Sequence, residues 1–495
     1  MRIASILLLL AAVFAPSAPF SAQAAATATP LRRQQMHAID SFVAGEMAQY
    51  HIPGAAIGVY SRGTILLAKG YGLANVELNV PVKPETVFES GSVGKQFTAA
   101  AIMMLAAEDK LSVDDSITKY FPGAPEAWKW ILIKNLLSQT SGLPDYDTPT
   151  LAGPGKPFYL RLDLTEDQML TQIEALPLQW TPGDRWEYSN TNYVLLGILI
   201  HRVAGIPYAE FLDKRIFGPL GMKSTRVISE RDIIPNRAAG YQIDASGQLT
   251  NQEWVSPTFD STADGSLYIN ILDMAKWDAA LYETQLLSQS SLDQMWTVYA
   301  LNDGKPNPGQ YGFGWWIRKQ NNQLLIEHDG AWQGFSCDIS RYPDDNLTVV
   351  VLTNLDSAHS DPRYMAHVIA GLADPRLTPS KLNAIPDTEP QIAAKLVKML
   401  NGLVAGEDVR PMFSIAFAQS ITPQVDEQAR KEFSVLWPGG SIELLKRQTP
   451  QGNSGRTISL FRVRKGSKAK LIVFALNGDG KIAMFRLLPN REYST

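Results

Sequence analysis

The chain has 495 residues, of which 45% are hydrophobic and 19% charged, and its formal net charge is −4. This length exceeds what one hydrophobic core usually spans, so two or three domains are expected. The sequence contains no block of Lys and Arg that could neutralise phosphates, which argues against a nucleic-acid partner.

The first 24 residues are typical of a secretory signal peptide. Arg2 precedes the apolar run 3–15, and the small residues at 22–24 provide a cleavage site after Ala24. The run is shorter than the ~20 apolar residues that span a bilayer, and no later stretch is long and apolar enough. The single cysteine, Cys337, excludes an internal disulfide. We therefore expect a mature protein that is soluble in the periplasm or secreted, without a transmembrane segment.

The next part of the chain predicts a domain over 25–374. Residues 34–50 have apolar positions at helical spacing, and residues 56–69 are typical of a β-hairpin. Residues 93–107 are apolar on nearly every side, which indicates a helix buried in the domain interior.

Helical segments with many Pro and Gly loops continue from about 108 to 300, and strand patterns return at 323–327, 335–340 and 347–353. Two early and three late strands predict one antiparallel sheet built from both ends of the domain. The expected class is α+β, with helices flanking the sheet and a large helical insertion.

The proline-rich residues 375–390 predict a linker, and residues 391–495 predict a small α+β domain. A helix is expected at 391–404, and strands are expected at 411–418, 441–446, 457–464, 470–475 and 481–487. This part has no histidine and no recognisable catalytic constellation, so its role stays open.

Three Ser-x-x-Lys motifs occur, beginning at Ser92, Ser116 and Ser467. In a helix this spacing places both side chains on one face, where a deprotonated lysine can accept the serine proton. Ser92 opens the buried apolar helix, whereas Ser116 follows an acidic surface stretch and Ser467 lies in a Lys-rich turn. Context therefore favours Ser92, with Lys95 as its partner.

Two further elements carry chemistry. Tyr188 and Asn190 form a Tyr-Ser-Asn motif, in which a tyrosine near a lysine can act as a general base and the amide can orient a substrate. The similar Tyr268-Ile269-Asn270 lies in an apolar run and is interpreted as structural. The third element is His328-Asp329-Gly330, at the end of a late strand.

Together and in this order, these motifs resemble the serine β-lactamase and penicillin-binding superfamily. The resemblance is to the class C-like branch, which also holds D,D-carboxypeptidases, D-aminopeptidases and esterases. Supporting stretches are Leu-Ser-Gln-Thr-Ser-Gly-Leu-Pro at 137–144, Phe-Gly-Pro-Leu-Gly-Met at 217–222 and Tyr-Gly-Phe-Gly-Trp at 311–315. The resemblance covers about 35–372 and does not extend to the C-terminal domain.

The resemblance implies that Ser92 is the acylated nucleophile and that Lys95 and Tyr188 form the general acid–base pair. It leaves open which group takes the serine proton. The remaining implied roles belong to the substrate-binding cleft, whose expected residues are Asn190, His328, Asp329, Gly330 and Ala331. Within that set, the backbone N–H groups of Ser92 and Ala331 would form the oxyanion hole.

This sequence departs from the family pattern at two places. At the third motif, the family's usual Lys-Thr-Gly or Lys-Ser-Gly is replaced by His328-Asp329-Gly330. A histidine is only partly charged near neutral pH, and Asp329 would repel a substrate carboxylate if it faces the cleft. Gln139 stands where relatives often have histidine, in a loop expected to be structural.

The expected function is an exported serine hydrolase acting on an ester or a D-amino-acid-containing peptide, with no cofactor and no metal. Two alternatives stay open: a class C-like β-lactamase or D,D-carboxypeptidase, and a penicillin-binding sensor that acylates without turnover. The sequence lacks Gly-x-Ser-x-Gly and His-Glu-x-x-His, which argues against an α/β-hydrolase and a zinc hydrolase. The expected partner is a small-molecule or short-peptide substrate.

Overall fold

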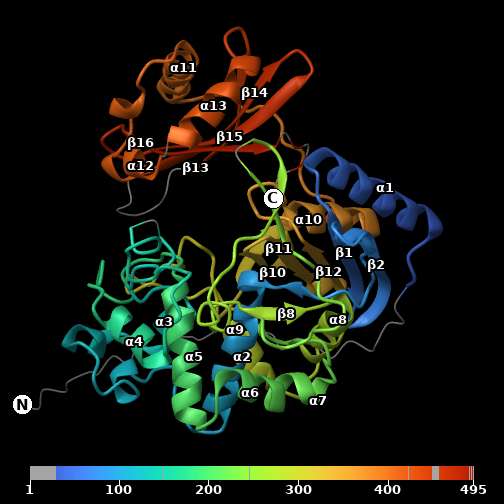
Figure 1. The fold of residues 1–495 in the computed structure, drawn as a ribbon, viewed down its shortest axis with the longest axis vertical. Helices are drawn as coiled ribbons and strands as arrows, with labels where there is room; N and C mark the ends of the chain where they lie inside the picture. Colours follow the sequence, from blue (N-terminus) through green and yellow to red (C-terminus); the bar gives the residue numbers. More distant parts are fainter. Residues whose placement is uncertain are drawn as a thin grey trace, which may run out of the picture.

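A computed structural model describes residues 29–148, 150–244, 246–421, 423–448, 456–489, 491 and 493. The signal peptide expected at 1–24 lies outside the described residues. Figure 1 shows two bodies, with the C-terminal domain above the larger N-terminal domain.

A seven-stranded antiparallel sheet forms the centre of the N-terminal domain, in the order β3-β2-β1-β12-β11-β10-β9. The early strand β1 pairs directly with the late strand β12, so both ends of the domain build one sheet, as predicted. The strands are β1 (Gly54–Ser61), β2 (Thr64–Asn75), β3 (Val80–Pro81), β9 (Trp316–Gln320), β10 (Gln323–Trp332), β11 (Phe335–Tyr342) and β12 (Leu347–Thr353).

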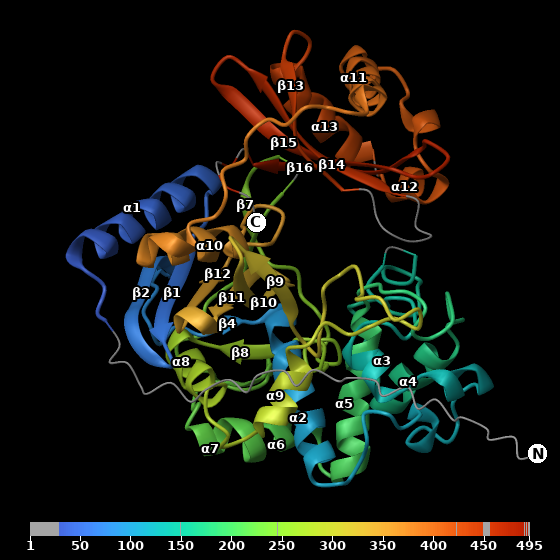
Figure 2. The same cartoon turned by 180° about the vertical axis from the view of Figure 1, so that it is seen from behind.

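The sheet separates two hydrophobic cores, because successive side chains of a strand point to opposite faces. On β10, Leu325 belongs to the core under α1 (Arg33–Tyr50) and α10 (Pro362–Ala373), whereas Ile326 belongs to the core on the other side. Figure 2 shows α1 and α10 together on one side of the sheet, with α8 (Ile271–Ala280) on the other. The fold class predicted from the sequence is confirmed.

The larger core lies between the sheet and the helical insertion, around α2 (Lys95–Ala107) and α5 (Asn190–Ala204). Every residue of α2 from Lys95 to Leu105 is buried, as its all-round apolar pattern predicts. The other helices here are α3 (Ile133–Leu137), α4 (Glu166–Glu174), α6 (Tyr208–Leu212), α7 (Gly218–Leu220), α8 (Ile271–Ala280) and α9 (Gln289–Met295). Short strands form two small sheets: β4 (Phe88–Glu89), β8 (Leu267–Ile269) and β5 (Arg226–Val227), and separately β6 (Tyr241–Ile243) and β7 (Leu249–Asn251).

The C-terminal domain has its own core and a four-stranded antiparallel sheet in the order β13-β14-β15-β16. Its elements are α11 (Pro390–Ala405), α12 (Ile415–Ser420), α13 (Pro423–Leu436), β13 (Ser441–Gln448), β14 (Thr457–Lys465), β15 (Lys468–Leu476) and β16 (Ile482–Pro489). The strand expected at 411–418 is wrong. Ser414 accepts a hydrogen bond from the Phe417 N–H and so begins α12, which is typical of a helix N-cap.

Residues 378–389, within the expected linker, contain no helix or strand and run between α10 and α11. The two domains also meet at an ion pair between Arg491 and Asp361, the residue that caps α10. Among the described residues, no single helix is long and apolar enough to cross a membrane. One pair, Asn190–Ala204 with Tyr208–Leu220, meets both criteria together but is bent by 74°.

Candidate active site

Ser92 lies on a tight 3₁₀ turn (Gly91–Gly94) between β4 and α2, packed against the end of β10. Glycine is required on both sides of this contact. A Cβ on Gly330 would lie 2.0 Å from the Ser90 carbonyl oxygen, and one on Gly91, whose φ is +48°, would lie 2.4 Å from the Ala331 nitrogen. These two glycines therefore let the backbone around Ser92 touch the backbone of the strand motif.

The backbone nitrogens of Ser92 and Ala331 both lie at this close contact. A Cβ added to Gly330 would lie 3.0 Å from the Ser92 nitrogen, and a Cβ added to Gly91 would lie 2.4 Å from the Ala331 nitrogen. This is the pair of N–H groups that the sequence predicts as the oxyanion hole. Paired backbone donors of this kind can stabilise a negative charge that develops on a substrate oxygen.

Lys95 is the first residue of α2 and is completely buried. Its Nζ lies 3.0 Å from Ser92 Oγ and 2.7 Å from Asn190 Oδ1, and it also donates to the Asp264 carbonyl oxygen. Burial lowers the pKa of Lys95 from 10.5 to about 8, although nearby carboxylates, Asp264 first, oppose this shift. A lysine so placed can exchange a proton with the serine hydroxyl near neutral pH.

Tyr188 covers this pair, with the Lys95 Nζ 5.0 Å from its ring centroid. The Tyr188 hydroxyl is buried and forms no hydrogen bond of good geometry with any described residue. The Ser92 side chain is nevertheless close enough to lower the pKa of Tyr188. The larger effect is burial, which raises the pKa of Tyr188 well above 10. The phenol therefore keeps its proton at neutral pH and can act as a donor.

Asn190 begins α5 and links Lys95 to a carboxylate that the sequence analysis missed. The Asn190 backbone and side-chain nitrogens lie 3.1 and 3.3 Å from the two Asp145 carboxylate oxygens. Burial raises the pKa of Asp145. The pKa of Asp147 is raised to about 7 by burial and by the nearby carboxylates of Asp145 and Asp264. The signal was available, because Asp145 directly follows the quoted stretch 137–144.

Gln139 holds the Tyr-Ser-Asn segment in place. Its Oε1 accepts hydrogen bonds from the Ser189 N–H at 3.1 Å and from Asn192 Nδ2 at 2.6 Å, and its carbonyl accepts from the Glu187 N–H at 3.1 Å. Gln139 is fully buried. Gln139, which departs from the family pattern, therefore supports the segment that carries Tyr188 and Asn190, as expected for a residue of a structural loop.

His328 lies on β10 and is buried on the Ser92 side of the sheet. Its Nδ1 lies 2.6 Å from the Asp329 carbonyl oxygen, which can only accept, so Nδ1 carries the proton. Nε2 then accepts from the Tyr311 hydroxyl at 2.9 Å. Burial lowers the pKa of His328 to about 4. The expectation of a partly charged histidine near neutral pH is corrected, because burial keeps the ring uncharged.

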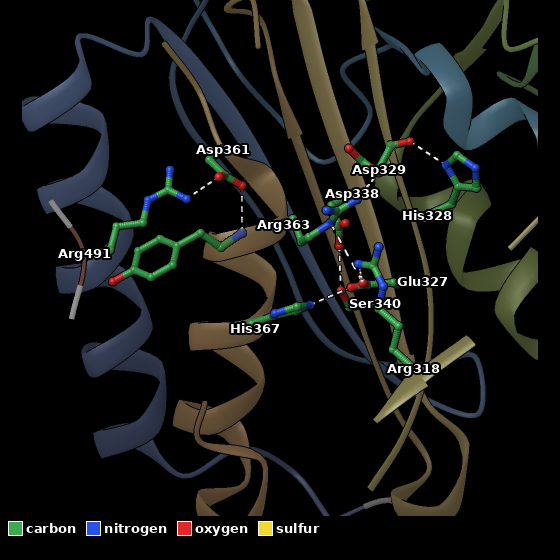
Figure 3. Close-up of polar contacts among 11 residues, drawn as sticks. Arg318, Glu327, His328, Asp329, Asp338, Ser340, Asp361, Arg363, His367 and Arg491 are labelled. Carbon is green, nitrogen blue, oxygen red and sulfur yellow. Dashed lines mark hydrogen bonds and ion pairs between the residues drawn. The ribbon is translucent and has the colours of Figure 1, made fainter. Parts of the chain in front are cut away.

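Asp329 points to the opposite face of the sheet, toward α10. Figure 3 shows Arg363 and His367 of α10 on one side of the strands and His328 on the other. The Asp329 carboxylate pairs with Arg363, and this cation lowers its pKa against the opposing effect of burial. Asp329 therefore does not face the cleft as a free carboxylate, so the expected repulsion of a substrate carboxylate does not arise.

Glu327, two residues before Asp329, has the same orientation and no exposed surface. It lies 2.6 Å from His367 Nε2 and 2.5 Å from Arg318 Nη1, with Arg363 Nε at 3.9 Å. Burial acts to raise the pKa of Glu327, but His367 and the two arginines hold it below its usual range. The motif strand thus carries its ionic groups on the α10 face.

The other two Ser-x-x-Lys copies do not bring serine and lysine together. Ser116 Oγ accepts from the Thr118 N–H while Lys119 pairs with Asp115, and Lys470 pairs with Glu432. The second Tyr-x-Asn motif is structural: Tyr268 lies in β8 and Asn270 caps α8. In the described part of the chain, no group of three or more His, Cys, Asp or Glu side chains could hold a metal ion.

A sequence model of the Beta-lactamase family matches residues 39–374. The chain is 31% identical over 313 residues to Penicillin-binding protein 4* of Bacillus subtilis, which covers 59% of this chain and 68% of that protein. It is 30% identical over 344 residues to Protein flp of Staphylococcus aureus strain MW2, covering 68% of this chain and 66% of that protein.

Solved structures share the fold. A D-stereospecific amidohydrolase from Streptomyces sp. has a TM-score of 0.56 and 25% identity, covering 70% of this chain and 99% of its own. The D-amino acid amidase of Ochrobactrum anthropi has a TM-score of 0.57 and 24% identity, covering 69% and 97%. The octameric penicillin-binding protein homologue from Pyrococcus abyssi has a TM-score of 0.59 and 22% identity, covering 92% and 96%. That last likeness extends over the C-terminal domain.

Proposed function

The chain belongs to the Beta-lactamase family, as its motifs indicated, and we propose that it is a serine hydrolase that forms an acyl-enzyme on Ser92. The observation that carries the proposal is the 3.0 Å contact between Lys95 Nζ and Ser92 Oγ, inside a buried site with two adjacent backbone donors. A nucleophile, a proton acceptor and an oxyanion hole are the parts that acyl transfer requires.

In the proposed reaction, neutral Lys95 takes the Ser92 proton as Oγ attacks the substrate carbonyl carbon. The carbonyl oxygen becomes an oxyanion held by the Ser92 and Ala331 N–H groups, and the bond to the leaving group then breaks. Tyr188, whose pKa burial keeps high, donates a proton to the leaving group and regains one from Lys95. Water attacks the ester on Ser92 in a second step that reverses these transfers and releases the acid.

The proposed substrate is a neutral ester or a D-amino-acid-containing amide or peptide. The support is the uncharged His328, which replaces the lysine that usually meets a substrate carboxylate. The fold shared with a D-stereospecific amidohydrolase and a D-amino acid amidase is consistent with this class. We therefore expect poor hydrolysis of penicillins and of peptides ending in D-Ala.

The second candidate is penicillin binding, either with turnover as in a β-lactamase or D,D-carboxypeptidase, or without turnover as in a sensor. The observation that favours it is the 31% identity to Penicillin-binding protein 4*. The two candidates share acylation of Ser92 and differ in which acyl donor is released.

One experiment separates them. The protein is incubated with a fluorophosphonate probe, a penicillin, an aryl ester and a D-amino-acid amide, and labelling is compared with turnover. We expect labelling by the probe and turnover of the ester or the amide, and loss of both in Ser92→Ala by about 10⁴-fold. Ser116→Ala is the matched control. The assignment would be refuted if Ser116→Ala were inactive while Ser92→Ala still reacted with the probe.

We also propose that the mature protein is exported to the periplasm or the medium. The support is the basic residue, short apolar run and small-residue site within residues 1–24. Cell fractionation with N-terminal sequencing of the mature chain tests this, and a cytoplasmic protein that retains residues 1–24 would contradict it.

A further inference from the structure

A cavity of about 310 Å³ lies between the end of β2, Glu89 of β4, the loop 237–240 and Asn251 of β7. Its walls include Glu77, Glu89, Glu230, Arg237, Asn251 and Gln252. None of the residues assigned to the acyl site is among them. The volume is at the lower end of the range for small-molecule sites, and the walls are mostly polar.

The buried part of this cavity holds an acidic side chain that lacks a partner. Glu89 is 7% exposed, and its Oε2 makes no hydrogen bond of good geometry among the described residues, although the Gln252 side chain is close enough to lower the pKa of Glu89. The Oε1 of Gln252, another wall residue, is also buried and unpartnered. Buried polar atoms in proteins are nearly always satisfied, so two such oxygens in one cavity point to a polar ligand that donates hydrogen bonds.

The rim adds charges of both signs. Glu77 accepts a hydrogen bond from Asn251 at 3.1 Å, and Glu230 accepts from Trp254 Nε1 at 2.8 Å. Arg237 donates to the Tyr268 hydroxyl at 3.2 Å. Across the described residues, none of Glu89, Glu230 and Arg237 takes part in an ion pair within 4 Å. The cavity thus presents carboxyl groups and one guanidinium that form no close ion pair.

We propose that this cavity binds an amino-acid-sized zwitterion, with its ammonium group toward Glu89 and Glu230 and its carboxylate toward Arg237. A simple cation would leave Arg237 without a counter-ion, and a simple anion would face three carboxyl groups. A metal ion is a poor occupant because no acidic cluster in the described residues has suitable geometry for one. A zwitterion satisfies both signs of charge and the unpartnered oxygens.

Binding should release a proton from Glu89. Burial, followed by the nearby Asp260 and Glu230, raises the pKa of Glu89 well above 4.5, while Gln252 and Arg237 oppose the shift. Burial thus favours the protonated form of Glu89, and an ammonium group that approaches it favours the ionised form. The other ionisable groups that face it, Tyr268 and Cys337, have raised pKa values and stay neutral at this pH.

Three probes of matched size test the proposal by calorimetry on the full-length mature protein: alanine as either enantiomer, ethylamine and propionate. Alanine should bind more tightly than either half-molecule. Titration at pH 7 in phosphate and in Tris, which differ in ionisation enthalpy, should report a release of protons when alanine binds. Glu89→Gln should abolish this proton release.

The variants separate the two ends of the ligand. Glu89→Gln should weaken alanine and ethylamine about tenfold or more and leave propionate unchanged, because it removes a charge-assisted contact. Arg237→Gln should weaken alanine and propionate by a similar factor and leave ethylamine unchanged. Glu283→Gln, an exposed glutamate outside the cavity, is the control and should change nothing.

Either of two results would overturn the proposal: no saturable heat with alanine near its solubility limit, or equal affinities in wild type and Arg237→Gln. If Glu89→Gln does not fold, Glu230→Gln and Arg237→Gln, on the exposed rim, decide the question. Since no acyl-site residue lines the cavity, failure here would leave the assignment of Ser92 unaffected.

Discussion

On the cleft face of β10 the motif residues are uncharged and closely packed, whereas on the α10 face they are charged and form ion pairs. His328 and Gly330 face the Ser92 turn, where the imidazole is uncharged and even a Cβ at Gly330 would clash. Glu327 and Asp329 face α10, where Arg318, Arg363 and His367 pair with them (Figure 3). Adjacent residues of one motif thus serve different purposes because a strand alternates its side chains.

This difference separates catalysis from support. Lys95 is the cation that contacts Ser92, and the motif strand adds no charge on that side. The ion pairs on the far face hold α10 to the strand that carries the expected oxyanion-hole residue. Substitutions on the two faces should therefore affect different measurements.

The largest effect is expected on the cleft side. Lys95→Ala and Tyr188→Phe should each slow acylation by about 10²–10⁴-fold, because each removes a group that transfers a proton. The double variant should be little worse than the slower single variant, since the two act as one unit. Rates of probe labelling and of ester turnover measure this.

Matched controls come from the motif copies that the fold places elsewhere. Lys119→Ala and Tyr268→Phe should retain the wild-type acylation rate. Strictly additive losses in Lys95→Ala with Tyr188→Phe would show that the two residues act independently.

The next largest effect is expected on the α10 face and on stability. Glu327→Gln leaves Arg318, Arg363 and His367 without their buried anion, and removing one partner from such a group costs about 3–5 kcal/mol. The pKa of Glu327 is lowered in the folded protein, so its contribution is fully present above pH 4.5, the ordinary value, and is lost as the pH falls further.

Urea unfolding of Glu327→Gln and wild type at pH 7 and in acid measures this. The difference in the free energy of unfolding should shrink toward low pH. Glu126→Gln, in an exposed surface pair, should leave stability unchanged. A Glu327→Gln protein as stable as wild type at pH 7 would contradict the comparison.

A smaller effect is expected on substrate choice, and it should depend on which face is altered. His328→Lys places a cation on the cleft face, so the ratio of penicillin turnover to ester turnover should rise about 10–100-fold, as a charged hydrogen bond of ~1.5–3 kcal/mol implies. Asp329→Thr should leave the ratio unchanged, because Asp329 pairs with Arg363 on the other face. A rise in the ratio for Asp329→Thr alone would show that its carboxylate reaches the substrate.

The smallest effect concerns pH. Acylation should be slow at pH 6 and rise through an apparent pKa of about 8, because Lys95 must lose its proton before it can accept one. Asp147→Asn removes a carboxylate that raises the pKa of Lys95, so the midpoint of the profile should move to lower pH. The pH dependence of probe labelling measures this, with Glu283→Gln as the control, and a midpoint that moves upward would refute the assignment to Lys95.

The sequence alone identified the motifs that depend on local order. Ser92 and Lys95 were distinguished from two decoy copies by the apolar helix that follows them, and burial of that helix is a property of its own residues. The sheet built from both ends of the domain was also predictable, because strand patterns at 56–69 and 323–353 need partners of the same kind. The α12 helix was missed because its cap is a single serine before an apolar run that suits a strand equally well.

Tertiary structure alone decided the electrostatics of the site. Nothing local to Asp329 indicates that Arg363, 34 residues later, pairs with its carboxylate, or that burial keeps His328 neutral. The contributions of Asp145 and Asp264 to the Lys95 environment likewise depend on loops brought together in space. A sequence specifies which residue types are available, but the charge that each one carries depends on burial and on partners far away along the chain, which only the folded chain assembles.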